Sequence, residues 1–180
     1  MADKRIIFKP SVDDDLRMDA CVDAAFACGW NTELDANPDS AKSRTGCILE
    51  VAICPMSWIA KLQPTIATSA MEFECAALSM SLCAATPLLD LAREIAKGLS
   101  FQIEQKLTFI ATVHKDNQGA LKLSNLEEGG NTPRSKFYAL RLHWFGSWLH
   151  RPQGDTGIKF IETNLQKADI RHAYKVSSRR

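Results

Sequence analysis

The stretch KLTFIATVHKDNQGALKL, residues 106–123, decides the fold. Its first part, 106–114, is a nearly continuous apolar run, which is typical of a strand at the centre of a sheet. The residues that follow predict a short helix over about 117–124, and Asp116 stands where the strand ends. A buried strand that runs directly into a helix predicts a sheet with helices packed against it.

Three further strands are predicted before this stretch. Residues 19–26 suit a short strand, and residues 46–52 and 54–62 are rich in Ile, Val and Trp. The last two are joined tightly enough to form a hairpin. Residues 29–44 carry Gly, Asn, Asp and Pro turn signals, and we expect a loop there.

Two consecutive helices are predicted between the hairpin and the central strand. Over 69–85, apolar residues recur on one helical face: Met71, Cys75, Leu78 and Leu82. We expect Pro87 to interrupt this helix. Thr86 is the expected N-cap of a second helix, 87–97, which ends at Gly98.

The C-terminal part adds a helix, a strand and a last helix. Residues 135–150 carry two aromatic and aliphatic stripes, which predicts a mostly buried helix. Residues 157–163 alternate like a strand, and residues 164–173 suit a final helix. The whole order predicts an α/β domain with a mixed five-stranded sheet flanked by helices.

The composition is that of one globular domain. The chain has 180 residues, of which 46% are hydrophobic and 24% charged, and these values argue against disorder and low-complexity architectures. We expect a polar lead-in over 1–18, the folded domain over 19–176 and a flexible basic tail over 177–180.

The charge is unevenly distributed along the chain. A formal net charge of +1, taken alone, argues against a strongly basic nucleic-acid binder. Residues 1–39 hold 4 Lys and Arg against 9 Asp and Glu, whereas residues 131–180 hold 10 against 3. The basic C-terminal third therefore leaves a polynucleotide partner open.

Neither a secretory signal nor a membrane-spanning run is visible. The longest apolar-rich stretch, 75–89, is shorter than the ~18–20 residues that a spanning helix needs. We expect an intracellular protein, cytoplasmic or nuclear, with no membrane partner. Its six cysteines are then expected to be reduced and mostly buried. Zinc is disfavoured because no cysteine pair has CxxC spacing and every His lies after residue 113.

Two short motifs are misleading. Asp35, Asn37 and Asp39 begin like a calcium-binding loop, but the glycine and the final glutamate that such a loop needs are missing. Residues 155–157 copy the Asp-Thr-Gly of aspartic proteases, yet they follow Pro152 near the C-terminus, where a surface turn is the better reading. Phosphate-binding loop, serine-hydrolase and zinc-protease motifs are absent from the sequence.

Acidic residues stand at the ends of predicted elements: Asp23, Glu72, Glu74, Asp116 and Asp169. Each has an ordinary structural reading, such as an edge residue facing water or a helix N-terminal charge. Together they can form a ring of four carboxylates at one end of the sheet. Only one of the two glutamates can contribute, because residues i and i+2 on a helix point in different directions. Such a ring repels itself unless cations occupy it, and two-metal phosphodiester hydrolysis requires this arrangement.

Seven stretches, in order, resemble the ribonuclease H domain that ends the polyprotein of copia-type retrotransposons. They are VDAAFACGW (22–30), DSAKSRTGCIL (39–49), CPMSWIAKLQ (54–63), IATSAMEFECAALS (66–79), KDNQGALKL (115–123), TPRSKFYALRLHWF (132–145) and QKADI (166–170). Each is weak alone, but seven in order are specific. The resemblance implies a ribonuclease H-like fold and cleavage of the RNA strand of RNA–DNA hybrids.

The resemblance also implies the site. It assigns the catalytic and metal-binding acids to Asp23, Glu74, Asp116 and Asp169, with Glu74 preferred because Cys-Ala-Ala-Leu follows it. By analogy Asp23 bridges two Mg²⁺ ions, for which Mn²⁺ can substitute, while Glu74 and Asp116 hold one ion and Asp169 the other. Candidates for nucleic-acid binding are Ser43, Arg44, Asn117, Gln118, Arg134, Lys136, Arg141 and His143. The implied partners are an RNA–DNA hybrid and a reverse transcriptase domain or larger assembly.

Other functions stay open. Four positions depart from the family pattern: Ala25, Cys75, Phe137 and Lys167. A domesticated, catalytically weak domain that serves as a binding or structural subunit is therefore the alternative. Exposure of Trp144 and Trp148 would favour a protein partner, and burial would place them in the core. An integrase or transposase is a third reading, but those sites end in a helix Glu, whereas the last candidate here is Asp169.

Overall fold

The structure is a computed structural model. It describes residues 17–30, 37–98, 111–124, 141, 144, 146–148 and 156–168. The predicted elements over 106–110 and 169–173, and most of 135–150, lie outside these residues. The described part of 135–150 is helical at Arg141, Trp144 and 146–148.

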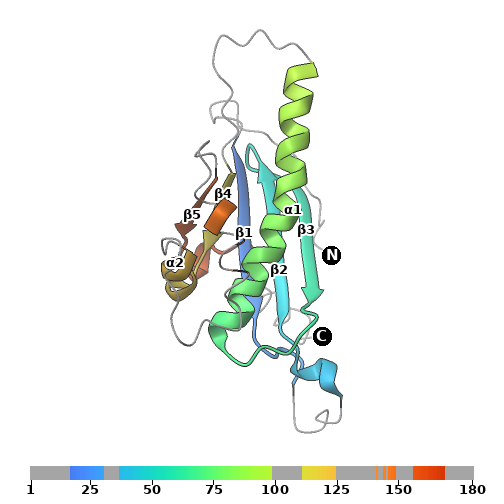
Figure 1. Ribbon diagram of the computed structural model, residues 1–180, viewed down its shortest axis with the longest axis vertical. Coiled ribbons are helices and arrows are strands. Elements are labelled where there is room, and N and C mark those ends of the chain that lie inside the picture. The colour runs from blue at the N-terminus through green and yellow to red at the C-terminus, as the bar shows by residue number, and fades with distance from the viewer. Residues whose placement is uncertain are drawn as a thin grey trace, which may run out of the picture.

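Five strands form one mixed sheet in the order β3-β2-β1-β4-β5 (Figure 1). They are β1 (Met18–Ala25), β2 (Arg44–Val51), β3 (Cys54–Leu62), β4 (Ala111–Lys115) and β5 (Thr156–Phe160). The first three form an antiparallel meander, whereas β4 and β5 run parallel to β1 and to each other. The predicted mixed five-stranded sheet is confirmed.

Strand β1 is the centre of the sheet, because it is paired along both sides. Every one of its residues is buried. Its apolar residues, with those of β2 and β4, pack against one helix face, and the core includes Val22, Leu49, Leu78, Leu89 and Val113. Burying each of these side chains contributes about 1.5–3 kcal/mol relative to exposure.

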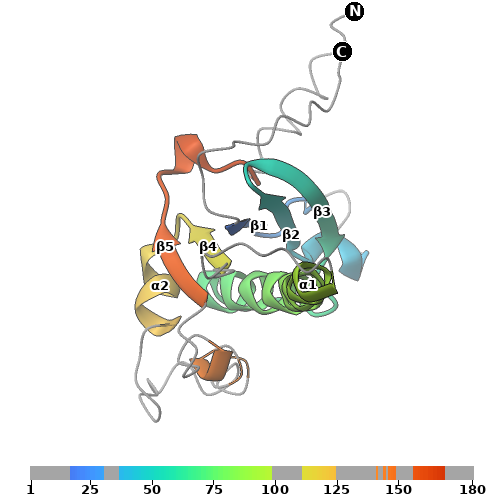
Figure 2. The same cartoon turned by 90° about the horizontal axis from the view of Figure 1, so that it is seen from above.

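Helices cover one face of the sheet. The long helix α1 (Ala70–Gly98) crosses in front of β1 and β2 and extends past the end of the sheet, and α2 (Gln118–Ser124) lies beside β4 and β5 (Figure 1). Seen from above, the 3-10 turn η3 (Thr163–Leu165) lies on the opposite face from α1 (Figure 2). A second 3-10 turn, η1 (Pro38–Ala41), precedes β2.

The predicted break at Pro87 is wrong, because α1 continues through this residue. Thr86 is not an N-cap: its hydroxyl donates to the carbonyl of Leu82 at 2.8 Å. Leu89, beyond the proline, is buried in the core. The burial of Leu89 helps to offset the one intrahelical hydrogen bond that proline cannot donate.

The continuous helix makes an apolar segment longer than the sequence pattern predicts. Its residues 70–95 are long and apolar enough to cross a membrane by length and composition. In this fold its apolar face packs on β1 and β2, as the core helix of a globular domain does.

The final predicted helix is also wrong over its described part. Residues 163–165 form a 3-10 turn, and extended and turn backbone follows to Ala168. The buried side chain of Gln166 donates from Nε2 to the carbonyl of Val22 at 2.9 Å and to that of His114 at 3.5 Å. These side-chain bonds hold the segment against the sheet without a helix.

All six cysteines are free thiols in the described residues. Four of them, Cys21, Cys47, Cys54 and Cys75, are buried, while Cys28 and Cys83 are exposed. Burial raises the pKa of Cys47 to about 11 and that of Cys75 to about 12. These four therefore serve as small apolar core residues.

Candidate active site

Two of the predicted acids lie at one edge of the sheet. Asp23 is near the end of β1, and Asp116 directly follows β4. Because β1 and β4 are parallel neighbours, with Cys21 opposite His114, the two strands reach this edge at the same level. Asp23 is buried, with 7% of its surface exposed.

Helix α1 brings the third acid, Glu74, and caps its own start with Glu72. Glu72 Oε2 accepts hydrogen bonds from Thr68 N and Thr68 Oγ1 at 2.8 and 3.0 Å. Ser69 Oγ accepts from Glu72 N at 3.2 Å. This pattern is a helix N-terminal cap. Glu74, two residues later, is buried instead and lines the pocket beside Asp23.

Gln63 anchors the turn of α1 that carries Glu74. Its side chain is buried and donates from Nε2 to the carbonyl of Phe73 at 2.8 Å and to Thr45 Oγ1 at 3.1 Å. Its backbone N–H donates to Ser43 O at 2.8 Å. The glutamine thus ties the first turns of α1 to the start of β2.

A pocket of about 490 Å³ opens where these elements meet. It is lined by Asp23, Ala24, Glu74, Asp116, Asn117, Gln118, Gly119 and Thr163. Three carboxylates from three separate chain segments therefore face one cavity. The fourth predicted acid, Asp169, lies outside the described residues.

Asn117 joins the pocket to α2. Its Nδ2 donates to Glu74 Oε1 at 3.4 Å, and its Oδ1 accepts from Gly119 N at 2.9 Å, so it caps the helix. A Cβ on Gly119 would lie 2.7 Å from Met71 Cε and 3.2 Å from Asn117 Oδ1. Gly119 thus leaves room for the methyl of Met71, which is the end of a flexible side chain.

A lysine lies among the three acids. Lys115, the last residue of β4, is fully buried, and its Nζ is 2.6 Å from Glu74 Oε2. The same atom is 3.4 Å from Asp116 Oδ1 and 3.9 Å from Asp23 Oδ1. It also donates to the carbonyl of Val22 at 3.2 Å. Sequence reasoning missed this residue, although a single charged residue ending an apolar strand was a visible signal.

Burial dominates the electrostatics of Glu74. Loss of solvent raises the pKa of Glu74 above its ordinary value. The ammonium of Lys115, and to a lesser degree the amide of Asn117, oppose this rise, while the charge of Asp23 adds to it. Burial thus favours the protonated form of Glu74, and the neighbouring ammonium of Lys115 favours the carboxylate.

Magnesium prefers carboxylate oxygens, so the donor chemistry of the pocket suits this ion. The position between the donors, however, is taken by the ammonium of Lys115. Within the part of the chain that the structure describes, no group of three or more His, Cys, Asp or Glu side chains is placed to hold a metal ion. In this arrangement, the cation that the three acids surround is the ammonium of Lys115.

The predicted nucleic-acid contacts differ in how exposed they are. Gln118 is exposed at the pocket and Asn117 lines it. Ser43 is fully buried, and its Oγ accepts from Ala27 N at 3.4 Å, so it supports a turn instead of facing solvent. Arg44 begins β2 and is half-buried.

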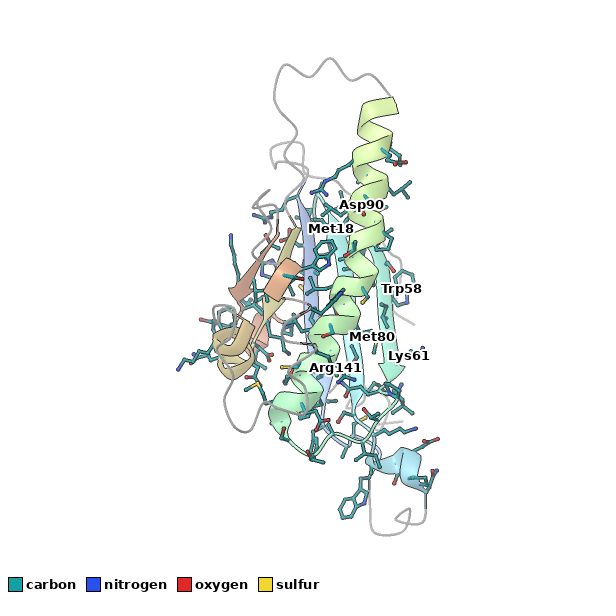
Figure 3. All side chains as sticks on the ribbon, viewed as in Figure 1. Met18, Trp58, Lys61, Met80, Asp90 and Arg141 are labelled. Carbon is teal, nitrogen blue, oxygen red and sulfur yellow. The ribbon has the colours of Figure 1, made fainter. Side chains whose placement is uncertain are left out.

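Arg141 is the one described member of the basic set on the predicted helix 135–150. It lies beside the N-terminal half of α1 (Figure 3), where its charge opposes part of the rise that burial causes in the pKa of Cys75. Arg134, Lys136 and His143 lie outside the described residues. Of the two tryptophans, Trp148 is buried and Trp144 is 37% exposed, with ring centroids 6.5 Å apart.

Comparison with known proteins identifies the fold. No family model matches the sequence, and a search of curated proteins finds no match. The structure is similar to the N-terminal RNase H domain of a Mycobacterium tuberculosis protein, solved as a fusion with maltose-binding protein. The TM-score is 0.50 at 12% identity, over 91% of this chain and 96% of that one.

A second similar structure is an RNase H1 isolated from compost by a metagenomic approach. It gives a TM-score of 0.47 at 11% identity, over 86% of this chain and 91% of that one. The first similarity, with the strand order above, shows that the chain has a ribonuclease H-like fold, as predicted.

Proposed function

We propose that this ribonuclease H-like domain is an endonuclease that cleaves the RNA strand of RNA–DNA hybrids, as in retrotransposon reverse transcription. The observation that carries the proposal is the convergence of Asp23, Glu74 and Asp116 on one pocket at the edge of the sheet. These acids come from β1, α1 and the end of β4, far apart in the chain.

The protein groups of the pocket account for parts of this activity. The carboxylates, with Asp169 as the proposed fourth acid, would hold two Mg²⁺ ions, or Mn²⁺ in their place, once the ammonium of Lys115 is displaced, and the ions would supply an activated water. Asn117 holds Glu74 in place. Gln118, which is exposed and lines the pocket, is the proposed contact to a sugar or phosphate.

The charge distribution supports a polynucleotide substrate. Residues 131–180 are strongly basic and include the proposed contacts Arg134, Lys136, Arg141 and His143. Hybrid recognition of this kind relies on backbone and groove shape, with the 2′-hydroxyl distinguishing the RNA strand. The resemblance to copia-type elements supports a reverse transcriptase domain as the partner and an intracellular location.

The test is cleavage of a labelled RNA–DNA hybrid in Mg²⁺ or Mn²⁺. The wild type is expected to cleave the RNA strand, and Asp116→Asn to abolish cleavage. Asp90→Asn is the matched control, because Asp90 is an exposed residue of α1, away from the pocket, and pairs with Arg93 at 3.4 Å. A folded wild type that cleaves at no metal concentration would refute the endonuclease.

The position of Lys115 favours a second candidate function. A cation of the chain already neutralises part of the acidic cluster. This arrangement suits a catalytically weak domain that serves as a binding or structural subunit. Gel-shift assays distinguish the two: the second candidate predicts hybrid or partner binding by the wild type with no cleavage at any metal concentration.

A further inference from the structure

We propose that Lys115 is a tethered counter-ion that competes with divalent metal for the carboxylates of the pocket. The inference rests on the proposed function, because it concerns how the same site is loaded. It adds that Lys115 of β4 sets the metal concentration at which the pocket binds a divalent ion.

The contacts of the ammonium are those of a bound cation. An ammonium has three N–H donors and no acceptor. Lys115 Nζ lies within 4 Å of all three acids, and closest, at 2.6 Å, to Glu74. It also donates to Val22 O at 3.2 Å. The side chain is 0% exposed, so water does not replace these contacts.

The backbone holds the lysine in place. Strand β4 pairs with β1 on one side and β5 on the other. The carbonyl of Lys115 accepts from Ile161 N at 3.1 Å. The anchoring carbonyl of Val22 is fixed in turn by Gln166 Nε2 at 2.9 Å. The neighbouring His114 reaches Asp19 at 2.8 Å, so the two side chains have separate partners.

The charges explain the competition. Without the ammonium, three carboxylates would share one pocket, and like charges this close repel each other unless a cation joins them. Lys115 supplies that cation from within the chain. A divalent ion that binds the same oxygens must therefore displace the ammonium, and the apparent metal affinity falls accordingly.

The experiment measures metal binding without any substrate. Lys115→Met keeps a side chain of similar length and removes the charge. Calorimetric titration with Mn²⁺ is expected to show binding at least tenfold tighter in Lys115→Met than in the wild type. Lys42→Met is the matched control, because it also breaks a short ion pair, 2.7 Å to Asp39, and it should leave metal affinity unchanged.

Equal metal affinity in Lys115→Met and the wild type would overturn the inference. If Lys115→Met unfolds, circular dichroism with and without Mn²⁺ gives the second measurement. Refolding on metal addition supports the inference, because the metal then replaces the lost charge. Failure to refold with metal, in both Lys115→Met and Lys115→Gln, overturns it.

The result is separable from the proposed function. Hybrid cleavage is measured in a parallel assay on the same variants. Tighter metal binding without cleavage supports the counter-ion and counts against the endonuclease. Cleavage by the wild type with no change of metal affinity in Lys115→Met supports the endonuclease and refutes the proposed counter-ion role of Lys115.

Discussion

Replacing Gln63 by Met should destabilise the domain by about 3 kcal/mol. The substitution preserves length but removes two side-chain hydrogen bonds, to Phe73 O and Thr45 Oγ1. Gln63 is 2% exposed and Thr45 0%, so the lost bonds are not replaced by water. Each net hydrogen bond is worth about 1 kcal/mol, and an acceptor left buried and unpaired adds to the cost, which gives about 3 kcal/mol in total.

The assay is urea denaturation followed by circular dichroism. The midpoint should fall with an unchanged slope, because the surface exposed on unfolding stays the same. At about 2–4 °C per kcal/mol, the melting temperature should drop by roughly 6–12 °C. The control Gln118→Met changes an exposed glutamine of α2 and should stay within about 0.5 kcal/mol of wild type. A loss below about 1 kcal/mol for Gln63→Met would refute the anchoring role.

Three further predictions follow from the packing and from the burial of the cysteines. Gly119→Ala should stay within about 1 kcal/mol of wild type by urea denaturation, since the Met71 methyl that the new Cβ meets ends a flexible side chain and alanine favours the helix; a loss above about 2 kcal/mol would contradict this. Pro87→Ala should stabilise the helix by about 1–3 kcal/mol in thermal melts, because Pro87 is exposed and its missing N–H is restored; a lower melting temperature would contradict this. Iodoacetamide at neutral pH should label Cys28 and Cys83 but not Cys47 or Cys75, whose pKa values are raised; peptide mass spectrometry checks this, and labelling of Cys75 in the folded protein would contradict it.

Strands were predictable because their signals are local. The hairpin of β2 and β3 follows from two β-branched and aromatic runs with a short connection. Helix α1 was not predictable as one element, because the rule that proline ends a helix is also local. The burial of Leu89 is a tertiary effect that overrides this rule, and no sequence pattern measures it.

The sequence predicted which acids would lie together, but it did not predict the lysine among them; the catalytic role of the acids stays a prediction. Asp23, Glu74 and Asp116 follow from the ordered motifs of a family resemblance, and the structure brings these three to one pocket. Lys115 carries no such motif. Its role depends on which face of β4 it occupies and on how close α1 lies, and both are set by long-range pairing of β4 with β1.

The parallel pairing of β1 with β4 has a consequence for how the chain folds. Strands β1, β2 and β3 follow one another in the sequence and pair through contacts between neighbouring segments. The second edge of β1 stays unpaired until β4, which begins at residue 111, has formed. Closing a loop of this length is slow, and an unpaired strand edge is a template for other chains. A nascent or truncated chain that lacks β4 therefore exposes its most buried strand, and premature termination should yield aggregates instead of a smaller stable sheet.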